Sequence, residues 1–235
     1  MATEILLWIM ILARVVIGVS LTRRALQKNV HSLLWLAAVF FINGFSNIFY
    51  TPTFYNGYVF FLGALPDQVC LILFIHRTFY RERRSPWAIF MAITLLGALA
   101  IALDFTERTI LNTVSVLIAC NMLWHTLIAV QAYRATASDR VVEDWVKARY
   151  RLMIAYCVLA VLFPVMGVID AVVDIPRSVA QPLIGLISIA AIVLQYLVWV
   201  MPEGFRRWLN RNYQSPVQDE AELTLSEEEI MGQLQ

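Results

Sequence analysis

Residues 58–79 read YVFFLGALPDQVCLILFIHRTF, an apolar run with a single carboxylate, Asp67, near its middle. About 20 consecutive apolar residues are enough to cross the ~30 Å hydrocarbon core of a bilayer as a helix. In lipid, every backbone N–H and C=O group needs a partner within its own segment, so such a run is expected to be helical. The stretch therefore predicts a transmembrane helix that carries a charge at membrane depth.

Six further apolar stretches of similar length fill most of the 235-residue chain. Hydrophobic residues make up 60% of the chain, charged residues 15%, and the mean hydropathy is +0.68, which is too apolar for a soluble domain of this size. We therefore predict an all-α polytopic membrane protein with seven transmembrane helices. The predicted spans are residues 5–21, 33–50, 58–79, 87–103, 110–133, 152–173 and 179–201.

The basic residues lie almost entirely on one side of these predicted spans. Fifteen lysines and arginines follow the first, third, fifth and seventh spans, whereas the opposite loops contain two, Arg108 and Arg177. Cytoplasmic loops of membrane proteins carry an excess of lysine and arginine. The pattern predicts an N-terminus outside the cell and a C-terminus in the cytoplasm.

The chain is expected to have one transmembrane domain, residues 1–201, followed by two short segments. In residues 202–213, Phe205, Trp208 and Leu209 fall at i, i+3 and i+4 with arginines on the other side, which predicts an amphipathic helix in the membrane interface. Residues 214–235 are acidic and are interpreted as a cytoplasmic tail, either solvated or docking a partner protein.

In helix number, orientation and length, the predicted topology resembles rhodopsin-like proteins and G-protein-coupled receptors, and also SWEET-type sugar transporters. The second resemblance implies a 3+1+3 helix organisation, and residues 36–47 (LAAVFFINGFSN) do align with residues 159–170 (LAVLFPVMGVID). A retinal Schiff base is excluded, because Lys28 and Lys147 both lie in predicted cytoplasmic loops and Gln195 occupies the depth of the seventh span.

Two charged residues lie at membrane depth, where a charge costs ~2.5–3.5 kcal/mol even on the most lenient scale. Arg14 and Asp67 are each about ten residues into their spans, which places both near 15 Å depth at ~1.5 Å per residue. We predict that they neutralise each other inside the bundle, directly or through water. The pair would be either a fixed packing element or part of a ligand site or proton relay.

Further polar residues at membrane depth complete a candidate ligand-binding site. Aromatic residues crowd the outer half of the second and third spans, which suggests an outward-opening pocket with Asn47, Asp67 and Asp170 at its floor. Pro66 removes a helical hydrogen bond next to Asp67, so freed carbonyls are expected to face a cavity. The predicted site residues are Arg14, Asn43, Asn47, Asp67, Gln68, Asn121, Asp170 and Gln195.

The sequence contains no nucleophile motif, phosphate-binding loop or paired metal-ligand spacing. We therefore expect no catalytic residue, no metal and no cofactor, and a net charge of +1 gives no reason to expect nucleic acid as a partner. The first hypothesis is a plasma-membrane receptor or sensor that binds a small molecule or a membrane-borne signal and contacts a cytoplasmic or membrane partner protein. The alternatives are a facilitative or proton-coupled transporter and an accessory subunit of a larger membrane complex.

Overall fold

The computed structural model describes residues 2–51, 53–80, 86–138, 142–173 and 177–211. For residues 2, 3, 163, 166–173, 177–182 and 184 it describes the backbone alone. All regular secondary structure in these ranges is helical, which confirms the predicted all-α class. The helices are α1 (Ala2–Lys28), α2 (Ser32–Ile48), α3 (Gly57–Leu62), α4 (Ala64–Phe79), α5 (Trp87–Leu103), α6 (Glu107–Ala137), α7 (Asp144–Val173), α8 (Arg177–Trp199) and α9 (Glu203–Leu209).

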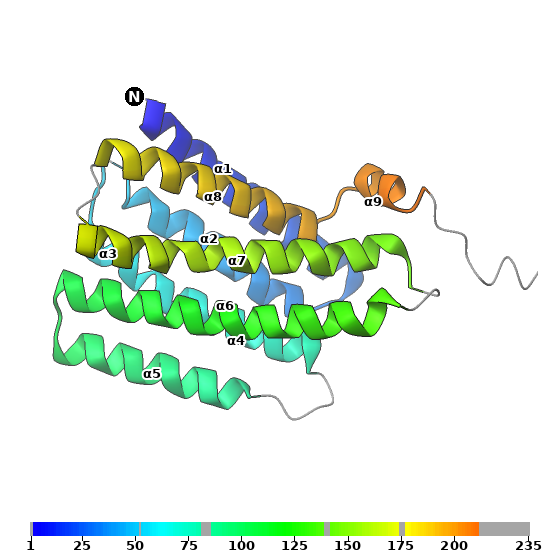
Figure 1. Ribbon diagram of the computed structural model, residues 1–235, viewed down its shortest axis with the longest axis horizontal. Coiled ribbons are helices and arrows are strands. Elements are labelled where there is room, and N and C mark those ends of the chain that lie inside the picture. Colours follow the sequence, from blue (N-terminus) through cyan, green and yellow to red (C-terminus); the bar gives the residue numbers. More distant parts are fainter. Residues whose placement is uncertain (1, 52, 81–85, 139–141, 174–176, 212–235) are drawn as a thin grey trace, which may run out of the picture.

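Six of the helices form a closed ring. In the order α1, α2, α4, α6, α7, α8 each helix packs against the next, and α8 packs back against α1 (Figure 1). Helix α5 lies outside the ring, at the bottom edge of Figure 1, where it packs against α4 and α6. Within α5 the buried residues are Thr94 and Ile101, so this helix contributes little to the interior.

Three helical segments in the described part of the chain are long and apolar enough to cross a membrane: Glu4–Lys28, Gly57–Phe79 and Glu107–Ala137. The segments Gly185–Trp199 and Glu203–Leu209 meet at an angle of 79°. If they are counted together as one bent span, the described part of the chain has four candidate spans. Helices α2 and α5 are apolar but shorter, at 17 residues each. Three to four helices with the length and composition of membrane spans are consistent with a membrane protein. The seven crossings and their orientation remain predictions.

The helix ends are defined by local capping. Asn29 adopts a left-handed φ of 52°, and Val30 N–H donates to Ala25 O at 2.9 Å, which closes α1 as a Schellman motif. Asn56 and Thr106 start α3 and α6 by accepting backbone N–H groups at Val59 and Thr109. These caps fix the short connections that bring successive helices back alongside each other.

Helix α3 and helix α4 form one span with a break at Gly63. A Cβ atom at Gly63 would overlap the Ser46 side chain of α2, so the close approach of these two helices depends on glycine. Pro66 and Asp67 follow this break and lie against α2.

Candidate functional site

Asp67 is the centre of a hydrogen-bonded cluster of side chains inside the ring. It is 8% exposed. Its Oδ1 accepts from Asn43 Nδ2 on α2 at 2.7 Å, and its Oδ2 accepts from Gln68 Nε2 at 3.1 Å. Gln68 Oε1 in turn accepts from Asn121 Nδ2 on α6 at 2.7 Å. Three helices are therefore joined through one carboxylate and three amides, in a buried site where each hydrogen bond to a charged group is strengthened.

Arg14 reaches the same cluster from α1. Its Nη1 donates to the backbone carbonyl of Asn43 at 3.5 Å, and it attracts Asp67 electrostatically without forming a direct ion pair. Asn43 stands between the two charges, because its backbone accepts from Arg14 and its side chain donates to Asp67. Of the two predicted forms of pairing, direct or through water, the direct ion pair is absent, and the neutral residue Asn43 contacts both charged side chains.

The cluster continues along α2 toward the end of that helix. Asn47 Nδ2 donates to the Asn43 carbonyl at 2.5 Å, and Asn47 is 7% exposed. On the opposite wall of the ring, the Tyr156 hydroxyl of α7 faces the Gln195 side chain of α8 and interacts electrostatically with Asp67 and Arg14. Every helix of the ring therefore presents a polar group to the centre.

Seven of the eight predicted site residues take part in this arrangement. Asp170 lies in the backbone-only part of α7, so its side chain lies outside the described residues. Tyr156 is absent from the predicted set, although it is a polar residue in an apolar span, and this is the signal that could have identified it. We refer to Arg14, Asn43, Asn47, Asp67, Gln68, Asn121, Tyr156 and Gln195 as the polar cluster.

An aromatic layer lies next to the polar cluster, toward the C-terminal ends of α4, α6 and α8. Its members are Phe74, Phe79, His125 and Trp199. The Phe74 ring meets Trp199 edge-on at 4.8 Å between centroids, and His125 stacks on Trp199 at 6.1 Å. Phe74 and His125 are fully buried, and Trp199 is 4% exposed. These rings pack against one another on that side of the polar cluster.

His125 is the unusual member of this layer. Neither ring nitrogen has a hydrogen-bond partner in the described part of the protein, and the imidazole is surrounded by Phe79, Tyr156 and Trp199. His125 follows Asn121 by one helical turn of α6. This spacing places His125 on the same face of α6 as Asn121, next to the polar cluster. The described residues contain no group of three potential metal ligands.

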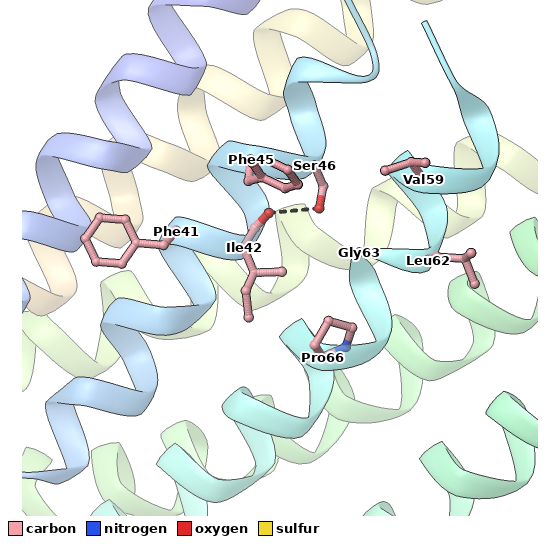
Figure 2. Close-up of a pocket in the computed structure, with 8 residues that line it drawn as sticks. All are labelled: Phe41, Ile42, Phe45, Ser46, Val59, Leu62, Gly63 and Pro66. Atoms are coloured by element: carbon pink, nitrogen blue, oxygen red, sulfur yellow. Dashed lines mark hydrogen bonds between the residues drawn. The ribbon is translucent and has the colours of Figure 1, made fainter. Parts of the chain in front are cut away.

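A groove of about 570 Å³ opens between α2 and the broken α3–α4 span (Figure 2). Phe41, Ile42, Phe45 and Ser46 line it from α2, and Val59, Leu62, Gly63 and Pro66 line it from the other side. The predicted pocket had aromatic walls and a floor of Asn47, Asp67 and Asp170. The observed groove has the aromatic wall, but its lining includes neither Asn47 nor Asp67, because both amide and carboxylate are turned into the bundle.

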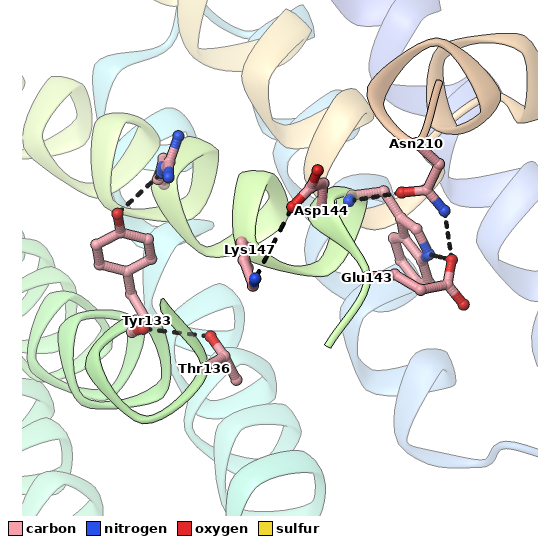
Figure 3. A network of polar contacts seen from close by, with 8 residues as sticks. Tyr133, Thr136, Glu143, Asp144, Lys147 and Asn210 are labelled. Carbon is pink, nitrogen blue, oxygen red and sulfur yellow. Dashed lines mark hydrogen bonds and ion pairs between the residues drawn. The ribbon is translucent and has the colours of Figure 1, made fainter. Parts of the chain in front are cut away.

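A second polar network joins α9 to the start of α7 (Figure 3). Asn210 Oδ1 accepts from the backbone N–H of Trp145 at 3.1 Å, and Asn210 Nδ2 donates to Glu143. The Arg206 guanidinium lies over the Trp145 ring at 5.6 Å. Within α9, a hydrogen bond from Arg207 lowers the pKa of Glu203. These contacts hold α9 against the bundle at the predicted cytoplasmic end.

Comparison with known proteins found no protein family, no curated protein and no solved structure that matches this chain. The assignment of function therefore depends on the geometry of the two polar networks and the groove.

Proposed function

We propose that this protein is a seven-helix membrane receptor or sensor, with crossings formed by α1, α2, α3 with α4, α5, α6, α7 and α8. In this arrangement the N-terminus is outside, α9 lies in the cytoplasmic interface, and the plasma membrane is the site of action. The protein would bind a small molecule or a membrane-borne signal and carry no enzymatic activity. Its partners would be the bilayer, the ligand and a cytoplasmic or membrane partner protein.

The observation that carries this proposal is the way Asp67 is held. Its carboxylate is satisfied by neutral amides from Asn43 and Gln68, and not by a direct bond to Arg14. A donor group or cation that reached Asp67 would compete with these amides and loosen the contact of α2 with α4. A change in one buried group thereby becomes a change in helix packing, which is how many membrane switches work.

The packed aromatic layer favours a receptor over a transporter. A carrier needs a path that opens alternately to each side of the membrane, whereas the buried rings of Phe74, His125 and Trp199 pack together next to the polar cluster. The aromatic layer instead connects the polar cluster to α8, which leads through the 79° bend into α9. A signal at Asp67 would reach the cytoplasmic face along this route.

The test follows the response of α9 to a change at Asp67. Gly204 has open space around its Cα, so Gly204→Cys is a suitable attachment site for an environment-sensitive fluorophore. Cys120 is replaced by alanine, since it is the one partly exposed native cysteine. We expect Asp67→Asn to shift the emission of the probe, and Thr94→Val, which removes a buried hydroxyl in the outer helix α5, to leave it unchanged. Identical emission in both variants would refute the receptor proposal.

A transporter is the second candidate because the polar cluster spans the ring from α1 to α8. Reconstitution in liposomes separates the two functions. Downhill flux of a small solute or of protons that disappears in Asp67→Asn would establish a carrier, whereas a receptor leaves the liposomes tight.

A further inference from the structure

Two arginines from different helices meet at the end of α8. Arg24 lies near the end of α1 and Arg149 near the start of α7, and both of these helices pack against α8. Arg24 Nη1 donates to the Trp199 carbonyl at 3.2 Å, and Cζ of Arg149 lies 5.2 Å from the centroid of the Trp199 ring. Trp199 is buried, and both arginines are partly buried. Two positive charges are therefore held beside one buried residue.

These two guanidinium groups have no negative partner among the residues that the structure describes. The ion pairs in those ranges involve neither arginine, and the charge of Arg24 acts unfavourably on Arg149. Arg24 uses one N–H on the carbonyl that ends α8, where the last carbonyls of a helix lack internal donors. The ring contact of Arg149 supplies no oxygen acceptor for its five N–H donors. A partly buried charge is costly unless it is paired, so this site has surplus positive charge and free donors.

In the proposed membrane placement, the two arginines lie at the depth of the lipid phosphates. Arg24 comes just after the first predicted span, Arg149 just before the sixth, and Trp199 in the last turn of the seventh. All three of these span ends face the cytoplasm in the predicted topology, and tryptophan is enriched in this interfacial region. Basic pockets between transmembrane helices on the cytoplasmic side bind anionic lipid head groups. The position therefore favours a lipid phosphate over a soluble anion.

We infer that Arg24 and Arg149 bind the phosphate group of an anionic lipid whose head group is a phosphomonoester, as in phosphatidic acid. One phosphate accepts N–H groups from both guanidinium groups, while the acyl chains stay in the bilayer. A phosphomonoester carries a charge of about −1.5 to −2 at pH 7, which balances two arginines. The planar guanidinium fork also matches the spacing of phosphate oxygens. This inference goes beyond the receptor proposal, because it needs the membrane placement of the helix ends and holds equally for a transporter.

A lipid phosphate at this site joins three helices. It bridges α1 to α7 at the end of α8, next to the Trp199 ring that packs on Phe74 and His125. The same end of α8 leads through the 79° bend into α9. The bound lipid therefore stabilises the cytoplasmic end of the bundle.

The experiment uses the full chain in mild detergent and native mass spectrometry, in which each bound lipid adds its own mass to the protein. Phosphatidic acid, phosphatidylglycerol and phosphatidylcholine with identical dioleoyl chains are titrated separately. We expect phosphatidic acid to bind about tenfold more tightly than phosphatidylglycerol, whose phosphodiester carries a single charge. Phosphatidylcholine, which has no net charge, should show no saturable binding.

Four variants sharpen this experiment. Arg24→Gln and Arg149→Gln should each weaken the binding of phosphatidic acid about tenfold. Arg23→Gln is the matched control, because it removes the same charge from an exposed neighbour on α1, and it should change the affinity less than about twofold. Arg149→Lys keeps the charge but not the planar fork, so it should recover only part of the affinity. Thermal unfolding without lipid verifies that each variant is folded, and phosphatidic acid should raise the Tm of Arg23→Gln but not that of Arg149→Gln.

Equal binding of the three lipids, or equal losses in Arg23→Gln and Arg149→Gln, would overturn the site, because surface charge alone would then explain the binding. Displacement of phosphatidic acid by an equal concentration of glycerol 3-phosphate would identify a soluble phosphate as the ligand and overturn the lipid assignment. The readout is independent of the α9 probe. Lipid binding at the two arginines without an α9 response to Asp67→Asn therefore refutes only the receptor role, and an α9 response without lipid binding refutes only this site.

Discussion

Asn43 and Asp67 face each other across the contact of α2 with α4, with 2.7 Å between the amide nitrogen and the carboxylate oxygen. This bond supplies one of the two amide donors that Asp67 receives, and the other comes from its own neighbour, Gln68. Asn43 is therefore the residue that attaches the carboxylate to another helix.

Replacing Asn43 by leucine should destabilise the protein by about 1–3 kcal/mol, because the carboxylate loses a donor while it stays buried. Unfolding in mixed micelles with increasing SDS measures this change. Thr94→Val is the matched control, since the Thr94 hydroxyl donates only to a carbonyl of its own helix. This substitution should lower the free energy of unfolding by no more than ~0.6 kcal/mol. Equal losses in the two variants would show that the contact with Asp67 contributes nothing particular.

The Arg14 and Asp67 charges should be coupled weakly. A broken buried ion pair costs about 3–5 kcal/mol, but here the two charges are separated by Asn43. A double-mutant cycle with Arg14→Gln and Asp67→Asn should give a coupling free energy of about 1 kcal/mol. A coupling as large as that of a buried ion pair would mean that the two side chains are in direct contact.

The all-helical fold, the buried position of Asp67 and most members of the polar cluster could be predicted from the sequence. A charge or amide in an apolar helix has to turn inward, so composition alone places it in the interior. The partners could not be predicted, because they depend on how each helix is rotated about its axis. The break at Gly63 shows why: it sets the orientation of the residues after it, and no periodicity in residues 58–79 specifies that rotation.

Gly63→Ala should destabilise the protein by about 1–3 kcal/mol, because the new methyl group would overlap the Ser46 side chain. Adding Ser46→Gly removes the clashing atoms, so the double variant should be more stable than Gly63→Ala alone. Gly204→Ala is the control: nothing lies within 4 Å of its added methyl group, and alanine favours a helix by up to ~1 kcal/mol. Without a rescue by Ser46→Gly, the close approach of the two helices would not be the reason for glycine at position 63.

His125→Phe should leave the stability within about 1 kcal/mol of the parent or raise it, because both ring nitrogens lack partners and an apolar ring fits among the surrounding aromatics. The SDS titration used for Asn43 measures it. A loss of several kcal/mol would instead show that the imidazole is held by a bound molecule or water.

Asn210→Ala should release α9 from α7 without unfolding the bundle. The amide is the group that both accepts from the Trp145 N–H and donates to Glu143, so one substitution removes both hydrogen bonds. Hydrogen exchange should become faster in residues 203–210 and at Trp145, while the amides of α4 and α6 keep their protection. Asn210→Gln is the second variant, because glutamine keeps the amide donor and acceptor on a longer side chain. It should restore part of the protection of α9 from hydrogen exchange. If Asn210→Ala leaves the exchange of α9 unchanged, the stacking of Arg206 on Trp145 is sufficient to hold this helix, and the polar network is not the link through which the bundle controls it.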